Sequence, residues 1–394
     1  MSSLIPFHWT NTTNIAYGVN AIEKFKQYIP SGARVAIVND GVTPQLCGAK
    51  QDLEKLLKEL NTSFRWLGGI EANPDFESCM KIIKNIRQDP VDFLIAVGGG
   101  SVMDATKFIS TAINLDPSID PYTTMRNPTL VKSIIPMLSI CTLSATGSEW
   151  NNGFVISRRA THEKLPMSNP LTYFKCSVLD PRYTLTVPAN QTANGLYDSF
   201  CHVMEQYITN TFSPFPDRLS ESVTKCILQN GPALMKDLKN LDLRGSMMIN
   251  SAWALNRTLG LGTKQCWGTH HLGHELTAYY GMDHGKTLAV IMPNLWRHFF
   301  DVKKFKLAQM ARRIFGKGGS FIDEDANYAI QKTEEWTQEI GMKLKISDYV
   351  KEPNVKKAVK ELTDGVWNLE NGKSFGEDGM ITKKDAEAIY AASF

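Results

Sequence analysis

The sequence has no run of 18 consecutive apolar residues, the length that a membrane-spanning helix needs. Its N-terminal stretch "MSSLIPFHWTNTTN" has neither a basic start nor a long apolar run, so we expect no secretory signal peptide. Neither sign of charge predominates, since the formal net charge is only +3. The basic residues also form no run interleaved with aromatics. We therefore predict a protein without a nucleic-acid or membrane partner.

Cysteines are few, with 7 in 394 residues, and they are scattered without any C-x-x-C pair. An odd, scattered set provides neither a disulfide framework nor a zinc knuckle and is typical of reduced thiols in a cytoplasmic protein. The hydrophobic content of 43% is ordinary for a globular chain, and a length of 394 residues favours two domains.

The first half of the chain alternates between apolar runs and amphipathic segments. The amphipathic segments predict helices at 43–61, 75–88 and 101–114. Thr43 can cap the first of these helices, and Pro44 suits its first position. The apolar runs predict buried strands at 34–40, 64–70, 92–100, 133–143, 153–158 and 174–180. Such alternation indicates an α/β domain with a parallel sheet covered by helices on both faces.

The second half contains only helical patterns. They predict helices at 190–210, 216–236, 244–261, 267–280, 301–315, 324–340 and 354–363. We place the boundary near residues 180–188, which predicts an α/β domain at 1–183 and an all-α domain at 184–394.

A glycine triplet, Gly98 to Gly100, stands between an apolar strand and a helix in "VGGGSVMDATK" (97–107). Glycines let a phosphate approach backbone N–H groups, and the positive end of the helix dipole favours an anion there. The alternative is a tight turn in which Ser101 and Asp104 form a capping box of the form S-x-x-D. Spacing alone leaves both interpretations open.

Asp40 lies at the end of the first strand of the alternating half, where an acidic side chain often binds an adenosine ribose and repels a 2′-phosphate. The alternative is a turn aspartate before Gly41. Together with the glycine triplet after another strand, Asp40 favours a dinucleotide site.

Histidines gather in "GTHHLGHELTAYYGMDHGKT" (268–287), which holds four of the eight in the chain. Two pairs have the i,i+4 spacing of one helix face: Asp198 with His202, and His270 with His274. His284 follows just beyond the second helix. One carboxylate and several imidazoles suit Fe²⁺ or Zn²⁺, although a solvated helix face is the alternative for either pair alone.

Four stretches give the chain a resemblance to a known family. They are "AVGGGSVMDATKF", "LSATGSEWNNGFVIS", "SVLDPRYTLTVPANQTANGLYDSFCHVMEQY" and "GTHHLGHELTAYYGMDHGKT". The chain resembles the iron-containing (group III) alcohol dehydrogenases, most closely the butanol-dehydrogenase-like branch. The resemblance implies an N-terminal dinucleotide-binding α/β domain, a helical C-terminal domain, a divalent metal in the cleft between them, and a homodimer.

The resemblance also implies roles for individual residues. The metal ligands would be Asp198, His202, His270 and His284, with the 14-residue separation of the last two matching the family. His274 falls on a family histidine near the nicotinamide that is linked with proton movement, whereas His271 has no such role and is interpreted as a helix residue beside the ligand. Trp150, Asn151 and Trp267 are candidate pocket residues. Cofactor contacts would come from Asp40, Gly98, Gly99, Gly100, Ser101, Asp104, Thr142, Ser144 and Lys164.

One segment departs from the butanol-dehydrogenase-like branch. Where this chain has "NDGVT" (39–43), many members of that branch have a glycine-rich stretch, and those members tend to take NADPH. Asp40 therefore favours NAD(H) over NADP(H).

The predicted activity is hydride transfer between a nicotinamide and a small primary alcohol or aldehyde, assisted by a divalent metal, with Fe²⁺ favoured and Zn²⁺ as the alternative. No cluster of Arg and Lys accompanies the metal motifs, which favours an uncharged substrate. A glycerol or polyol dehydrogenase and a dehydroquinate-synthase-like lyase would share this architecture, and a nucleotide-binding scaffold without turnover is a third alternative.

Overall fold

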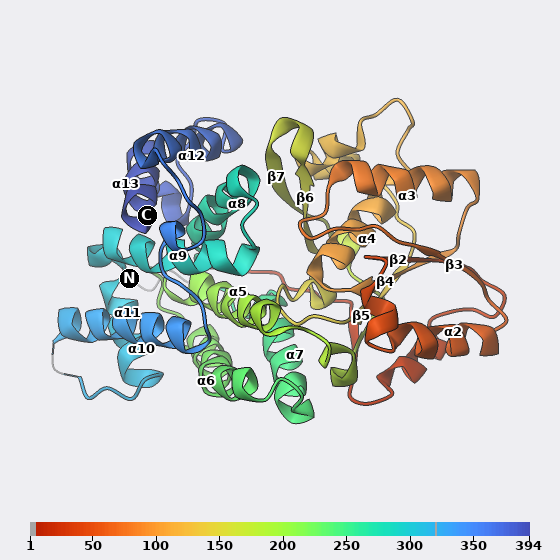
Figure 1. The fold of residues 1–394 in the computed structure, drawn as a ribbon, viewed down its shortest axis with the longest axis horizontal. Coiled ribbons are helices and arrows are strands. Elements are labelled where there is room, and N and C mark those ends of the chain that lie inside the picture. The colour runs from red at the N-terminus through yellow and green to blue at the C-terminus, as the bar shows by residue number, and fades with distance from the viewer. Residues whose placement is uncertain (1–4, 320) are drawn as a thin grey trace. The chain divides into compact units, whose positions relative to one another are not determined.

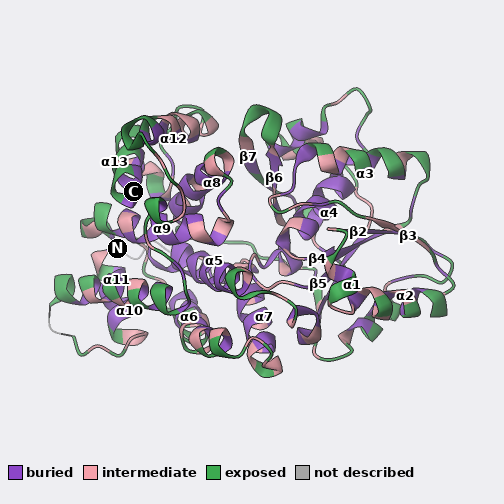
Figure 2. Cartoon of the chain, in the orientation of Figure 1, coloured by how far each residue is buried: buried purple, intermediate pink, exposed green. Residues whose placement is uncertain are grey.

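A computed structural model describes residues 5–319 and 321–394 of the chain. Two compact units make up these residues (Figures 1 and 2). The sheet unit comprises Thr10–Pro188 and Asp237–Asn256, and the helical unit comprises residues 5–9, Ala189–Lys236 and Arg257–Phe394.

A parallel sheet of six strands forms the centre of the sheet unit. Its order is β1-β8-β5-β4-β2-β3, so β1 and β3 are the edge strands. The strands are β1 (Asn14–Tyr17), β2 (Arg34–Asn39), β3 (Ser63–Leu67), β4 (Phe93–Gly98), β5 (Met137–Cys141) and β8 (Cys176–Leu179). An antiparallel hairpin of β6 (Gly153–Arg158) and β7 (Glu163–Ser168) accompanies this sheet.

Helices cover both faces of the sheet (Figure 1). Leucines of α2 (Ala49–Glu59) pack in one core with alternate residues of four strands, such as Ile37 and Val97. Helices α3 (Phe76–Gln88) and α4 (Gly100–Ala112) lie on the opposite side. Because both faces are covered, the central strands are mostly apolar, as the sequence predicts, and the buried hydroxyls of Ser139 and Ser177 hydrogen-bond each other at 2.7 Å. The predicted fold class is confirmed.

The predicted helix at 43–61 is two helices, α1 (Thr43–Leu46) and α2, because Gly48 takes a left-handed conformation with φ of 87°. The predicted cap is wrong by one residue: Val42 is the N-cap residue of α1, Thr43 is its first residue and Pro44 its second. The strands β1 and β7 were not predicted, since four-residue β1 is too short to show a pattern and β7 contains Pro166.

One helix from the second half of the chain belongs to the sheet unit. Helix α7 (Leu241–Leu255) packs beside the segment after β8, where Gly245 comes so close to Tyr17 that a Cβ would meet the Tyr17 hydroxyl. Trp253 of α7 also stacks edge-on against Trp150, with ring centroids 5.2 Å apart. The compact units therefore divide the chain differently from the predicted domains 1–183 and 184–394, because these tertiary contacts draw residues 237–256 out of the helical half.

The helical unit is built around α5 (Ala189–Tyr207), whose residues 192–207 are all buried (Figure 2). Neighbouring helices α6, α8 and α9 pack against it. The other helices are α6 (Pro214–Lys236), α8 (Gly268–Tyr280), α9 (His284–His298), α10 (Phe300–Arg313), α11 (Ile322–Glu339), α12 (Val355–Leu369) and α13 (Lys383–Ser393).

Helices α9 and α13 were not predicted, and α9 is central to the site described below. Glycine marks the turn into α9: Gly281 has φ of 67°, and its N–H donates to the carbonyl of Thr277 at the end of α8. Among the described residues, no helix is both long and apolar enough to cross a bilayer.

Candidate functional site

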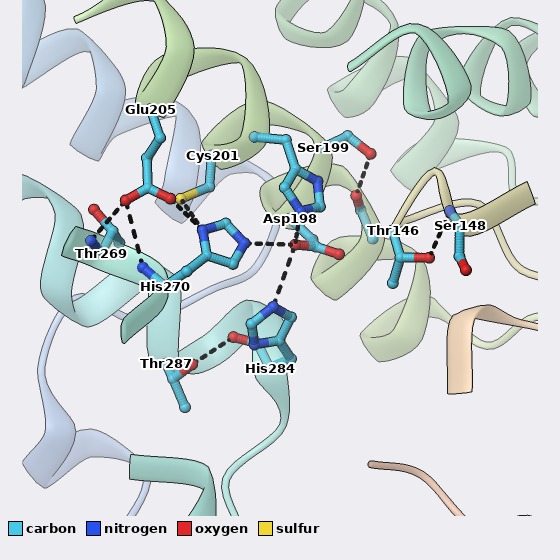
Figure 3. Close-up of polar contacts among 12 residues, drawn as sticks. Thr146, Ser148, Asp198, Ser199, Cys201, Glu205, Thr269, His270, His284 and Thr287 are labelled. Carbon is cyan, nitrogen blue, oxygen red and sulfur yellow. Dashed lines mark hydrogen bonds and ion pairs between the residues drawn. The ribbon is translucent and has the colours of Figure 1, made fainter. Parts of the chain in front are cut away.

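Three helices of the helical unit bring together one carboxylate and three imidazoles (Figure 3). Asp198 and His202 lie one turn apart on α5, His270 lies in the first turn of α8, and His284 begins α9. Asp198, His202 and His270 are at most 7% exposed. The two motifs that were recognised separately in the sequence thus meet in one cluster.

The spacing inside the cluster is that of ligands around an ion. Asp198 Oδ1 lies 3.5 Å from His202 Nε2 and 3.6 Å from the Nε2 atoms of His270 and His284. These distances exceed a good hydrogen bond. Two ligands of one tetrahedral ion, each about 2.1 Å from it, would be about 3.4 Å apart. The donor set and its spacing therefore fit a divalent first-row metal.

His202 has the neutral charge state that a metal ligand needs. Burial lowers the pKa of His202 to about 4, and the carboxylate of Asp198 offsets this only in part. The ring is thus neutral near pH 7, and a neutral imidazole carries the lone pair that binds a metal.

A carboxylate from α5 holds the other side of His270. Glu205 contacts His270 Nδ1 and also accepts hydrogen bonds from the backbone N–H groups of Thr269, at 2.6 Å, and His270, at 3.4 Å. Burial disfavours charge on His270, but the carboxylate of Glu205 outweighs it, so the pKa of His270 is raised well above 6.5. Because Nδ1 faces this carboxylate, it carries a proton in the neutral ring as well as in the charged ring.

His274 borders the cluster. It is 7% exposed, and its ring centroid lies 6.2 Å from that of His270 and 5.4 Å from that of His284. His271 instead pairs with Glu370 at 2.7 Å and stacks on Phe375.

In the sheet unit, the glycine triplet joins β4 to α4. Gly99 caps α4, and no side chain caps that end. A Cβ on Gly100 would come within 2.4 Å of Thr146, and one on Gly98 would come within 2.5 Å of Val102. Close packing around the helix N-terminus therefore requires these glycines, in addition to any phosphate that they admit.

The capping-box alternative for Ser101 and Asp104 is wrong. Ser101 Oγ accepts from the N–H of Asn73, whereas Asp104 accepts from Ser148 Oγ at 2.7 Å and from the N–H of Val155 at 3.0 Å. Asp104 lies in the protein interior, at 9% exposure, where these long-range partners satisfy its carboxylate in place of the helix N-terminus. Burial raises the pKa of Asp104 to about 6. Its role as a cofactor contact stays a prediction.

The remaining candidate cofactor residues lie in the sheet unit as follows. The Lys164 ammonium donates to Asn73 Oδ1 at 2.9 Å, which places Lys164 near Ser101. Thr142 is buried directly after β5 and donates its backbone N–H to the carbonyl of Gly98, while Ser144 is half-buried in the following loop.

Asp40 follows β2, and its carboxylate accepts from the backbone N–H groups of Val42 and Thr43.

Family comparisons cover nearly the whole chain. Residues 12–181 match the iron-containing alcohol dehydrogenases, and residues 192–394 match the C-terminal part of the Fe-containing alcohol dehydrogenase family. The chain belongs to this family.

Individual relatives extend over the full length. The chain is 38% identical to the NADPH-dependent aldehyde reductase YqhD of Escherichia coli (strain K12), over 98% of this chain and 99% of that protein. It is 32% identical to the NADH-dependent butanol dehydrogenase A of Clostridium acetobutylicum, over 99% and 100% of the two chains. The crystal structure of E. coli K-12 YqhD matches with a TM-score of 0.95 at 36% identity, covering 100% of both chains.

Two site residues of this iron-containing alcohol dehydrogenase were missed from the sequence. Glu205 could have been found, since it lies seven residues after Asp198 and three after His202 on the same helix face. Asn73 offered no such signal, because its left-handed backbone, with φ of 54°, and its contacts to Ser101 and Lys164 are visible only in the fold.

The candidate pocket residues lie in different units. Trp267 precedes α8 and has its ring centroid 5.4 Å from that of His270. Asn151 is buried in the sheet unit, where its backbone and side-chain oxygens accept from the buried ammonium of Lys107, and Trp150 packs on Trp253. Trp267 is therefore the pocket candidate that contacts the histidine cluster.

Proposed function

We propose that this iron-containing alcohol dehydrogenase transfers hydride between NAD(H) and a small, uncharged primary alcohol or aldehyde of the butanol type. The observation that carries the proposal is the cluster of Asp198 with three imidazole Nε2 atoms, each 3.5–3.6 Å from one carboxylate oxygen. The relatives named as an aldehyde reductase and as butanol dehydrogenases support the reaction class.

Asp198, His202, His270 and His284 would hold the metal, with Fe²⁺ favoured and Zn²⁺ as the alternative. One carboxylate and three neutral imidazoles would leave the centre with a net charge of about +1. When bound, the ion supplies Lewis-acid polarisation of the substrate oxygen, and the nicotinamide supplies or accepts the hydride.

The protein must also move the proton that accompanies the hydride. His274 shares a face of α8 with His270, and its ring lies between 5 and 7 Å from two rings of the cluster. We assign to it the transfer of this proton, because an imidazole exchanges protons readily near neutral pH.

The dinucleotide would be held in the sheet unit by the turn at Gly98–Ser101, where the N-terminus of α4 favours a pyrophosphate. Asp40 supports NAD(H), since its carboxylate would repel the 2′-phosphate of NADP(H). The names of the relatives divide on this point: YqhD is NADPH-dependent and the butanol dehydrogenases are NADH-dependent.

The charges beside the cluster support an uncharged substrate. Lys286 lies two residues after His284, but its ammonium pairs with Asp283 at 2.6 Å. Lys286 therefore does not provide an unbalanced cation for a phosphorylated substrate. From the family resemblance we also propose a homodimer in the cytoplasm.

Steady-state assays would test the proposal. The protein, reconstituted with Fe²⁺, Zn²⁺ or Mn²⁺, is assayed with NADH and NADPH across aldehydes of two to six carbons. The expected result is metal-dependent oxidation of NADH by a small aldehyde, and accumulation of NADH in the reverse direction. A lyase would regenerate NAD⁺ in each cycle, and a non-catalytic scaffold would give no turnover.

A further inference from the structure

Glu205 is a buried acid whose partners lie around a single histidine. Its side chain is 4% exposed, and it stands on α5 one turn beyond His202. We propose that Glu205 is a positioning residue that sets the ring orientation and the tautomer of His270. The inference rests on the proposed function only in assuming that the cluster of Asp198, His202, His270 and His284 holds a metal.

The carboxylate of Glu205 fixes both the backbone and the ring of His270 (Figure 3). Its Oε1 atom accepts from the N–H of Thr269 at 2.6 Å and from the N–H of His270 at 3.4 Å, at the N-terminus of α8. Its Oε2 atom contacts His270 Nδ1. A negative charge is favoured at a helix N-terminus, so one side chain anchors the start of α8 to α5 and aims the imidazole.

These contacts select the tautomer. A carboxylate can only accept a hydrogen bond, so His270 Nδ1 must be the donor. When a metal ion displaces the other proton of the ring, the lone pair is on Nε2, the atom that lies 3.6 Å from Asp198 Oδ1. This Nε2 atom is buried and has no hydrogen-bond partner among the described residues. Such an orphaned acceptor aimed into the cluster is what a metal ligand requires.

A second group of metal-type side chains shares His270. The ligand atoms of Cys201, Glu205 and His270 lie within 4.8 Å of one another. An ion held there would have to replace the proton between Nδ1 and Glu205 and would use the opposite side of the ring. The geometry favours the cluster around Asp198, because it leaves the bonds from Glu205 to Thr269 and His270 in place.

The test is Glu205→Gln, which keeps the size of the side chain. Its carbonyl oxygen can still accept from Thr269, but its NH₂ group would face Nδ1 and force that atom to accept. The proton of the neutral ring would then move to Nε2 and block the ligand position. We expect the Kd for Zn²⁺, measured by titration against a competing chelator, to rise about 10- to 100-fold. The absorption bands of the Co²⁺ form should also change.

Two matched variants serve as controls. Glu275→Gln removes another buried carboxyl from α8, 7% exposed and packed against Gly365, and should leave the Kd for Zn²⁺ unchanged. Cys201→Ser should also leave it unchanged. A large loss of Zn²⁺ affinity in Cys201→Ser would place the ion in the second group and overturn the inference.

The remaining outcomes separate the inference from the proposed function. A wild-type protein that binds no divalent ion would overturn the metal site itself. A wild-type protein that binds Zn²⁺ while Glu205→Gln binds it within about threefold would overturn only the role of Glu205. Spectra of ¹⁵N-histidine in the Zn²⁺-loaded wild type give a readout that needs no variant: Nδ1 of His270 should carry the proton, and a metal-bound Nδ1 would contradict the inference.

Discussion

The Oδ1 atom of Asp40 accepts a 2.8 Å hydrogen bond from the backbone N–H of Thr43. Its Oδ2 atom contacts the hydroxyl of the same threonine. The carboxylate is therefore held in place directly after β2, and we expect a carboxylate fixed there to disfavour a 2′-phosphate.

Replacing Asp40 should relax the preference for NAD(H). Asp40→Asn keeps an oxygen that can accept from Val42 and Thr43 and removes only the charge, whereas Asp40→Gly removes both. We expect each variant to raise kcat/KM for NADPH relative to NADH by a factor of about 5–30, equivalent to about 1–2 kcal/mol. A wild-type enzyme with the higher kcat/KM for NADPH would refute the assignment.

His274→Asn tests the proton role. Loss of a general acid–base group typically lowers the rate by about 10²–10⁴-fold, and the pH profile of kcat should change with it. Metal content, measured in the same samples, should stay near that of the wild type. If kcat and its pH dependence are both unaltered, His274 is a packing residue beside the cluster.

The buried acid Glu275 gives a prediction for stability. Burial raises the pKa of Glu275 from 4.5 to about 7 in the folded protein. Between these values the folded state holds a proton that the unfolded state releases, so stability falls as pH rises from about 4.5 to 7. Above pH 7 the cost is constant at about 3 kcal/mol.

Glu275→Gln should remove this pH dependence. In urea unfolding, the wild type should lose about 3 kcal/mol more than the variant between pH 4.5 and pH 8. Comparing how the free energy of unfolding changes with pH in the wild type and in the variant cancels the contributions of other buried acids such as Glu149. Equal slopes would mean that Glu275 is hydrated or ionised in the folded protein.

Local patterns predicted most of the fold and indicated a metal site, whereas the choice of His270 and His284 as ligands came from the family resemblance. The apolar strands and the i,i+4 pair of Asp198 and His202 are properties of neighbouring residues, so the sequence displays them directly. The break at Gly48 was missed because the leucines of 43–61 continue a helical pattern across it.

Tertiary partners explain what could not be predicted. Asp104 and Ser101 match a capping box in sequence, yet residues more than 25 positions away bind both side chains. The place of α7 in the sheet unit likewise depends on its contacts with Tyr17 and Trp150. The contact of Glu205 with His270 joins residues 65 positions apart, so only the fold reveals it.

The most direct test of the central claim is the metal content of the protein and of His270→Ala. The wild type should bind one divalent ion per chain, and His270→Ala, which removes a ligand, should bind it orders of magnitude more weakly and lose activity in parallel. His298→Ala is the matched control, because His298 is exposed and pairs with Asp385. Full metal occupancy and normal turnover in His270→Ala would contradict the assignment of the cluster as the metal centre.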